Sequence, residues 1–243
     1  IINCTVFIFM ISAIIISFND NSYLDTCLKH LSFVSQIIVI GTLDSKIELG
    51  LKKEFDFDFI ENKKDESSIL FKIATKYCKH DWILGIEANM IIPNDLRNEI
   101  QSVVDTQKTS KIFKAKTQFE FMGKSMKFSG FRTKWTSILW PKKIENIVSS
   151  QLNSRSITLY LDFDIFSQRT TEVAKRKALR LQSRKIKPNM IDFIWKPLWT
   201  LKKDCIFNLC MLDGKQGFVL AYLRAFMQVK TYLFLWLNYR DLE

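Results

Sequence analysis

The chain has 243 residues, of which 47% are hydrophobic, and a formal net charge of +11 at neutral pH. This length allows one large α/β domain, or one domain with an appendage. Seven glycines and four prolines are too few for a collagen-like, low-complexity or disordered chain. The excess of Lys and Arg predicts an acidic partner: nucleic acid, anionic lipid or a phosphorylated substrate.

The cysteines and histidines are scattered along the chain without a CxxC pair or another short spacing. They are Cys4, Cys27, Cys78, Cys205, Cys210, His30 and His80. A zinc site needs clustered ligands, so this pattern argues against one. An odd number of isolated cysteines is typical of a reducing compartment, where cysteines act mostly as small buried apolar groups.

Residues 1–18 are nearly all apolar and fit either a buried first strand or a short membrane span or signal-peptide core. They lack a basic flank and a small-residue cleavage site before Asn19, which favours the strand. Met10 and the β-branched run after it indicate a natural start, with residues 1–9 as an upstream extension.

The first hundred residues alternate between short apolar runs and helical patterns. Strands are expected at residues 13–17, 36–40, 55–60 and 82–86. Helices are expected between them at residues 24–31, 46–53 and 67–78. Strands separated by helices of this length predict βαβ units and a mainly parallel sheet flanked by helices, which is an α/β fold.

Past Pro93 the pattern changes. Residues 95–104 have a helical pattern, and residues 110–131 alternate polar and apolar side chains as antiparallel strands do. A basic helix is expected at residues 170–187, and two more helical stretches follow within residues 188–243. We therefore expect an α/β domain over residues 1–165 and a basic, aromatic-rich helical tail over residues 166–243.

The most informative segment is residues 81–89, Asp-Trp-Ile-Leu-Gly-Ile-Glu-Ala-Asn. It predicts a buried strand that ends on Glu87 and Asn89. Residues i and i+2 of a strand point to the same side, and open α/β sheets bind ligands at the carboxyl ends of their strands. The pair therefore predicts a site for one cation or one diphosphate. The alternative is a turn after a buried strand, in which Asn89 caps the next segment.

Taken together, the segments resemble family 2 glycosyltransferases, in particular the branch of lipopolysaccharide-core glucosyltransferases. Ile-Ile-Ile-Ser-Phe-Asn-Asp at residues 14–20 looks like the family's first strand and the turn after it. The other matching segments are residues 36–40, 80–89, 121–124 with 130–131, 196–199, 212–218 and 221–222. They follow the family's order along nearly the whole chain, and the last three resemble a carboxy-terminal signature of that branch.

This resemblance implies a GT-A-type fold that moves a hexose from a nucleoside-diphosphate sugar to a lipid-linked saccharide of the cell envelope. It also implies peripheral attachment to the cytoplasmic face of the inner membrane. Glu87 and Asn89 stand where the family has the two aspartates that hold Mg²⁺ or Mn²⁺. The positions that correspond to the family's nucleotide pocket are Asn19, Asp20 and Asp44.

The departures from the family fall where the chemistry is expected. Gly41 replaces the aspartate after the second strand, Phe71-Lys72 replaces a Lys-Asn pair, and Lys134 replaces the acceptor-side aspartate. The family's His-Glu dipeptide has no counterpart. The nearest acidic candidates for a general base are Asp162 and Asp164, which alternate with apolar residues as on a strand. Two hypotheses follow: a divergent hexosyltransferase, or a non-catalytic homologue that acts as a binding or scaffold protein.

The tail carries seven basic residues and no acidic residue between positions 175 and 187. Arg176, Arg180 and Arg184 share one helix face at i, i+4 spacing. Because Trp- and Phe-rich helices follow, the tail predicts attachment to an anionic membrane surface. The alternative is that these helices pack on the domain or on a partner. The sequence argues against nucleic acid, since the aromatic residues lie in apolar surroundings and no nucleic-acid module is visible.

Overall fold

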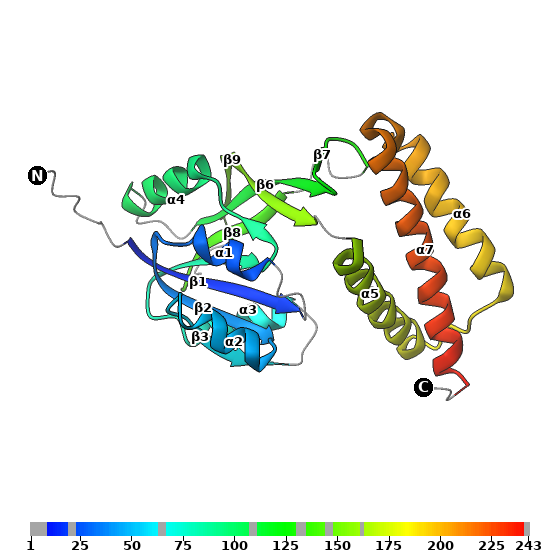
Figure 1. The fold of residues 1–243 in the computed structure, drawn as a ribbon, viewed down its shortest axis with the longest axis horizontal. Coiled ribbons are helices and arrows are strands. Elements are labelled where there is room, and N and C mark those ends of the chain that lie inside the picture. Colours follow the sequence, from blue (N-terminus) through cyan, green and yellow to red (C-terminus); the bar gives the residue numbers. More distant parts are fainter. Residues whose placement is uncertain are drawn as a thin grey trace, which may run out of the picture. The chain divides into compact units, whose positions relative to one another are not determined.

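The computed structural model describes residues 9–18, 23–62, 67–106, 111–129, 135–143, 148–160 and 163–240 (Figure 1). The chain divides into two compact units. The first, the sheet unit, takes residues Ile1–Thr117 and Lys134–Leu159. The second, the helical unit, takes residues Gln118–Thr133 and Tyr160–Glu243. The expected tail, residues 166–243, lies wholly within the helical unit, which also includes residues 118–133.

Four parallel strands form one half of the sheet. They are β1 (Phe9–Phe18), β2 (Val34–Thr42), β3 (Asp58–Glu61) and β4 (Trp82–Glu87), in the spatial order β3-β2-β1-β4. The connecting helices are α1 (Leu24–Lys29), α2 (Ser45–Leu51) and α3 (Ser67–Thr75). The predicted α/β class, with parallel strands flanked by helices, is confirmed.

β1 lies in the middle of this half and is buried on both faces. Ala13 and Ile15 pack in the same core cluster as Leu24 of α1. Ile14 packs in a second cluster with Leu70 of α3. Helices on both faces explain why β1 reads as a continuous apolar run rather than as an alternating one.

Antiparallel strands extend the sheet beyond β4. They are β8 (Trp135–Pro141), β6 (Lys111–Phe121), β9 (Val148–Tyr160) and the short β5 (Met90–Ile91), while β7 (Lys124–Met126) pairs with the end of β6. Helix α4 (Asn94–Thr106) precedes β6. The antiparallel strands expected within residues 110–131 are therefore confirmed for β6 and β7.

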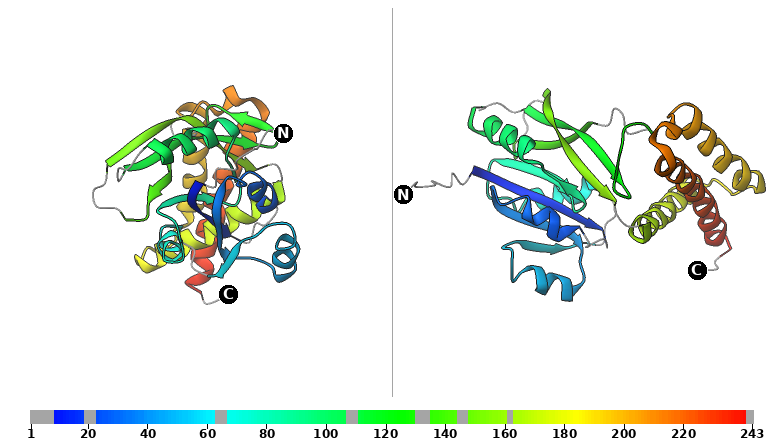
Figure 2. Two further views of the ribbon diagram at one scale, coloured as in Figure 1. Left: turned by 90° about the vertical axis from the view of Figure 1, so that its left-hand side faces the viewer. Right: turned by 45° about the horizontal axis from the view of Figure 1, so that its top comes forward.

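The helical unit contains α5 (Phe163–Ser183), α6 (Met190–Ile206), the 3₁₀ turn η1 (Cys210–Asp213) and α7 (Gly214–Asn238). α7 packs against both α5 and α6 (Figures 1 and 2). Ala178, Tyr232 and Leu235 form a buried cluster in this unit. The basic helix and the two further helices predicted for the tail are confirmed.

Among the residues that the structure describes, one helical stretch, Cys210–Asn238, is long and apolar enough to cross a membrane by length and composition alone. This stretch contains two cations, Arg224 and Lys230. Both cations have partners in the helical unit: Arg224 donates to the Ser129 carbonyl at 2.6 Å, and Lys230 to the Thr171 hydroxyl at 2.7 Å. A core helix satisfies the same length and composition, and a third of the apolar window is buried.

Buried thiols behave as the sequence predicts. Cys27, Cys78 and Cys210 are buried. Burial raises the pKa of the Cys27 thiol to about 12, so this group stays protonated and apolar at neutral pH. Cys205 and Cys210, five positions apart, approach to 3.4 Å between their sulfur atoms, a proximity that their spacing did not indicate.

The Asp213 carboxylate joins two distant segments of the helical unit. It accepts hydrogen bonds from the backbone N–H groups of Lys127 and Phe128, and from the Ser129 hydroxyl at 2.7 Å. Its own carbonyl accepts from Lys124 Nζ at 2.7 Å. The two resemblance segments at 121–124 and 212–218 therefore meet through Lys124 and Asp213.

A Cβ atom at Gly217 would lie 2.1 Å from the Cys210 carbonyl oxygen, so only glycine lets α7 begin this close to η1.

Asp213→Ala should lower the free energy of unfolding by about 2–4 kcal/mol, because it leaves the donors of residues 127–129 without their acceptor in a partly buried loop. Faster hydrogen exchange at the amides of Lys127 and Phe128, measured with the urea unfolding midpoint, checks this. Asp25→Ala is the control: the partly exposed Asp25 forms a surface ion pair with Lys29, so its loss should leave the midpoint nearly unchanged. Unchanged exchange at both amides in Asp213→Ala would contradict the assigned role.

Candidate functional site

The strand order reverses between β1 and β4. From β1 the chain moves outward to β2 and β3, then returns to place β4 on the other side of β1. β1 and β4 are parallel, with Ile16 opposite Glu87. The N–H of Ala88 donates to the Ile16 carbonyl at 2.9 Å. Ligands of open α/β sheets bind at such a reversal, outside the carboxyl ends of the strands.

Glu87 and Asn89 lie at this edge, but in different backbone environments. β4 ends at Glu87, whose side chain is partly exposed. Asn89 falls in the turn between β4 and β5 and is 2% exposed. The sequence predicted that strand alternation directs both side chains to one side. Because β4 ends before Asn89, strand alternation does not determine the direction of the Asn89 side chain.

The donor chemistry of this pair fits a hard divalent cation. The Glu87 carboxylate and the Asn89 amide offer the oxygen ligands that Mg²⁺ and Mn²⁺ prefer. Within the described ranges, no group of three or more His, Cys, Asp and Glu side chains comes together to hold a metal ion. Of the Glu87–Asn89 pair, only Glu87 would bring a negative charge to a cation, whose further charge compensation would come from a ligand's oxygens.

Two of the three predicted nucleotide-pocket residues, Asn19 and Asp20, lie outside the described residues, directly after β1 in sequence. Asp44 follows β2 and is exposed. Its side chain accepts a hydrogen bond from the Lys46 N–H at 2.8 Å and so caps α2. The structure thus gives Asp44 a local structural role, and its role toward a nucleotide stays a prediction.

Gly41, which the sequence resemblance sets against an aspartate, has surroundings that the sequence did not reveal. It lies opposite Ser17 in the β1–β2 pair and has φ +136°. A Cβ atom at Gly41 would lie 1.9 Å from the Ser17 carbonyl oxygen. An aspartate therefore cannot enter here without moving the backbone of β1 or β2.

Phe71, at the other substituted position, is part of the core. Its ring meets Trp140 of β8 edge to face, with centroids 5.4 Å apart. Both residues pack against the buried cluster that contains Ile14 and Ile83. At Phe71 an apolar core contact thus stands where the sequence resemblance implies a polar side chain.

The structure describes the backbone of one of the two candidate bases. Asp162 lies outside the described residues. Asp164 belongs to the first turn of α5 in the helical unit, so the strand expected there is wrong. The segment from Phe163 onward is helical. Its buried residues, Phe166, Ala174 and Ala178, recur at a helical rather than an alternating spacing.

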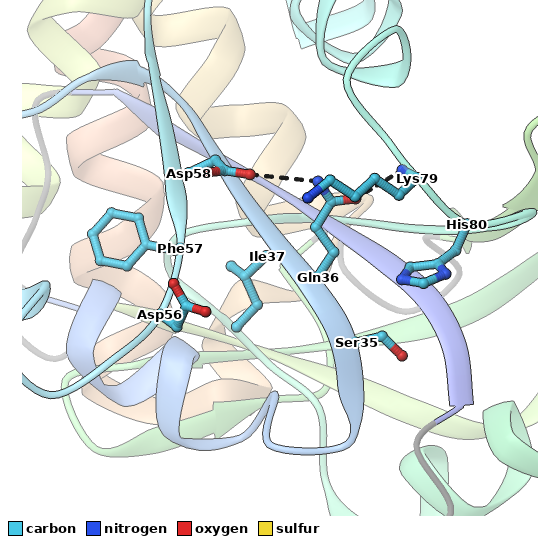
Figure 3. Close-up of a pocket in the computed structure, with 8 residues that line it drawn as sticks. All are labelled: Ser35, Gln36, Ile37, Asp56, Phe57, Asp58, Lys79 and His80. Carbon is cyan, nitrogen blue, oxygen red and sulfur yellow. Dashed lines mark hydrogen bonds between the residues drawn. The ribbon is translucent and has the colours of Figure 1, made fainter.

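A depression of about 260 Å³ lies at the opposite, amino edge of the parallel strands (Figure 3). Gln36 is at its centre: Oε1 accepts from the Ser12 hydroxyl and the Lys79 N–H, both at 2.8 Å. Its Nε2 donates to the Tyr77 carbonyl at 3.2 Å and to Asp58 at 3.4 Å. Both polar atoms of the Gln36 side chain are hydrogen-bonded within the protein and link neighbouring strands. We therefore do not take this depression as the candidate site.

No protein-family model matches the sequence. Among solved structures, HddC from Yersinia pseudotuberculosis is 18% identical, with a TM-score of 0.35 over 43% of this chain and 58% of its own. Residues 1–349 of TarS from S. aureus are 10% identical, with a TM-score of 0.44 over 96% of this chain and 92% of that fragment. The 4-diphosphocytidyl-2C-methyl-D-erythritol synthase from Anaerococcus prevotii is 11% identical, with a TM-score of 0.43 over 64% and 94%.

In a longer TarS structure the chain spans 54% of the length, so it matches about half of that protein and of HddC. At these identities and TM-scores the likeness defines neither a substrate nor an activity for this chain.

Gly41→Asp should destabilise the protein by about 3 kcal/mol or more, since the new Cβ collides with the Ser17 carbonyl and the backbone conformation favours glycine. Gly50→Asp is the matched control, because Gly50 lies in α2 and a Cβ atom added there would have nothing within 4 Å. Urea unfolding followed by circular dichroism measures both. Equal midpoints for the two variants would show that β1 and β2 can adjust.

Proposed function

We propose that the chain is a family 2 glycosyltransferase-like protein. It binds a nucleoside-diphosphate sugar at the carboxyl edge between β1 and β4 and transfers the hexose to a lipid-linked saccharide of the cell envelope. One observation carries the proposal: Glu87-Ala88-Asn89 ends β4 beside the end of β1, where the strand order reverses. The lipopolysaccharide-core type of acceptor comes from the sequence resemblance.

Transfer from a nucleoside-diphosphate sugar requires charge compensation at this edge of the sheet. A diphosphate leaving group develops negative charge, which a bound Mg²⁺ or Mn²⁺ would offset. Glu87 supplies the charged ligand and Asn89 a neutral oxygen, so the site holds one negative charge fewer than a pair of aspartates. Affinity for the cation should therefore be weaker without the diphosphate than with it, since the diphosphate supplies the missing charge.

A second candidate function is a binding protein that keeps this site without turnover. The observation that favours it is the packing at two substituted positions, Gly41 against Ser17 and Phe71 against Trp140. At both places backbone or apolar contacts occupy the space that polar ligand-binding groups have in the family. Such a protein would hold a saccharide, a nucleotide or a partner transferase.

Calorimetric titration of the full chain with UDP, with and without Mn²⁺, tests the site. We expect binding that needs Mn²⁺ and that weakens about tenfold or more in Glu87→Gln, because this substitution removes the one charged ligand. Glu54→Gln is the control, since Glu54 is an exposed residue after α2. No binding of UDP or of other nucleoside diphosphates by the unaltered protein would rule out the donor site.

If UDP binds with Mn²⁺ but incubation with UDP-hexoses and lipid-linked acceptors gives no product, the binding-protein function is favoured. Release of UDP together with a glycosylated acceptor would establish the transferase. Glu87→Gln should abolish that release while leaving the urea unfolding midpoint near the unaltered value, because the Glu87 side chain is partly exposed.

We also propose peripheral attachment of the helical unit to the cytoplasmic face of the inner membrane. What supports this is a row of large apolar side chains on α6 that recur at i, i+4 spacing and stay exposed: Met190, Ile191, Ile194, Trp195, Leu198 and Trp199. Met190 is 78% exposed and Trp195 60%. An exposed apolar face on a helix of a basic protein fits the interface of an anionic bilayer.

Trp195→Gln combined with Trp199→Gln should weaken co-sedimentation with phosphatidylglycerol vesicles about tenfold or more, because two aromatic anchors are lost from the bilayer interface. The control is Ile47→Gln with Leu49→Gln, which removes two exposed apolar residues from α2 in the sheet unit. Equal loss in both double variants, or no vesicle binding by the unaltered protein, would contradict attachment through α6.

A further inference from the structure

A basic cavity of about 320 Å³ lies within the helical unit, between α5 and α7. From α5 it is lined by Lys177, Arg180, Leu181 and Arg184, and from α7 by Gln228, Thr231 and Tyr232. The spacing of the four α5 residues places them on one helix face, one turn after another. The sequence had grouped Arg176 with Arg180 and Arg184, but Arg176 instead lies 3.9 Å from Glu172.

The cavity concentrates positive charge without a lining carboxylate. Across the part of the chain that the structure describes, Lys177, Arg180 and Arg184 make no side-chain hydrogen bond or ion pair. Two other cations of this unit do have partners: Lys230 donates to Thr171, and Arg224 lies 3.4 Å from Asp204. Three cations that line one cavity whose lining holds no carboxylate repel one another, and a bound anion relieves this repulsion.

The surroundings of Lys177 disfavour the positive charge on its side chain. Its side chain is partly buried, and burial lowers the pKa of its ammonium group because the charged form loses hydration. Tyr232, across the cavity, is buried, and burial together with the nearby Asp192 carboxylate raises the pKa of its phenol. Tyr232 is therefore a neutral hydroxyl at physiological pH and can donate a hydrogen bond to an anion.

We propose that this α5–α7 cavity binds a phosphate group carried by an organic molecule. The two guanidinium groups match the paired oxygens of a phosphate, and Lys177 adds a compact charge. Leu181 and the Tyr232 ring give the cavity apolar walls, which suit the organic part of a phosphate ester. The phosphate can come from an anionic lipid headgroup or from a soluble phosphate ester, since both present the same chemistry.

This inference goes beyond the proposed transferase function and does not depend on it. Its residues belong to the helical unit, whereas Glu87 and Asn89 belong to the sheet unit. Binding of UDP with Mn²⁺ therefore reports on one site and binding of phosphate esters without metal on the other. Each can fail while the other holds.

The first test titrates the full chain with glycerol 3-phosphate, and with inorganic phosphate for comparison, in calorimetry without divalent cations. Arg180→Gln with Arg184→Gln should weaken binding about tenfold or more, because it removes both guanidinium groups. The matched control is Lys185→Gln with Lys187→Gln, which removes the same charge from exposed residues that do not line the cavity. Equal weakening in both double variants would overturn the proposal, because it would show attraction by overall charge alone.

Lys177→Met separates a binding role from a structural one. It keeps an unbranched apolar side chain, one atom shorter, and removes a partly buried cation. We expect loss of phosphate-ester binding with an unchanged or raised melting temperature, since Lys177 has no hydrogen-bond or ion-pair partner among the described residues. Retained binding, with folding intact, would overturn the role of Lys177.

Vesicles distinguish the two sources of the phosphate. If the headgroup is the ligand, Arg180→Gln with Arg184→Gln should reduce co-sedimentation with phosphatidylglycerol vesicles more than Lys185→Gln with Lys187→Gln does. If vesicle binding is equal in both while glycerol 3-phosphate binding is lost only in the first, the ligand is a soluble ester. Binding of a single-stranded oligonucleotide at this cavity, with no binding of either phosphate ester, would overturn the proposal in favour of nucleic acid.

Discussion

The burial of β1 on both faces is the constraint on which the sheet unit depends. Its alternate residues belong to two separate cores, with Ile15 in the α1-side cluster and Ile14 in the α3-side cluster. A shift of one residue would exchange the two sets and place each against the wrong helix, so the register of β1 is strongly fixed. That register sets Gly41 against Ser17 on one side and Glu87 against Ile16 on the other. The position of the candidate site is thus a consequence of how β1 is packed.

The same constraint explains the departures from the glycosyltransferase pattern. At Gly41 the Ser17 carbonyl leaves no room for a side chain, and at Phe71 the ring packs on Trp140. These positions are filled by the protein itself, whereas the Glu87–Asn89 turn still carries oxygen donors at the carboxyl edge. The two functional hypotheses therefore differ in what this turn can do, and at Gly41 and Phe71 packing within the protein accounts for the residue present.

In the helical unit a buried carboxylate has the organising role. Asp213 satisfies backbone donors of residues 127–129, and Arg224 binds the Ser129 carbonyl from α7. Lys124 also binds the Asp213 carbonyl, so the resemblance segments at 121–124 and 212–218 are in contact. The sequence showed both segments, but it did not show their contact, because a hydrogen bond over more than eighty positions leaves no local periodicity.

Sequence alone determined the order and type of most elements, since the periods of two and 3.6 residues reflect which faces are buried. The four parallel strands, the antiparallel β6 and β7 and the tail helices all follow from that pattern, whereas Glu87 and Asn89 as site residues stay a prediction. Tertiary structure alone decided that Asn89 is buried in a turn, that Asp164 begins a helix, and that Gly41 admits no side chain. It also decided that Lys177, rather than Arg176, joins Arg180 and Arg184 at one cavity. These features depend on contacts between elements, whose distances and free space are set only when the elements pack together.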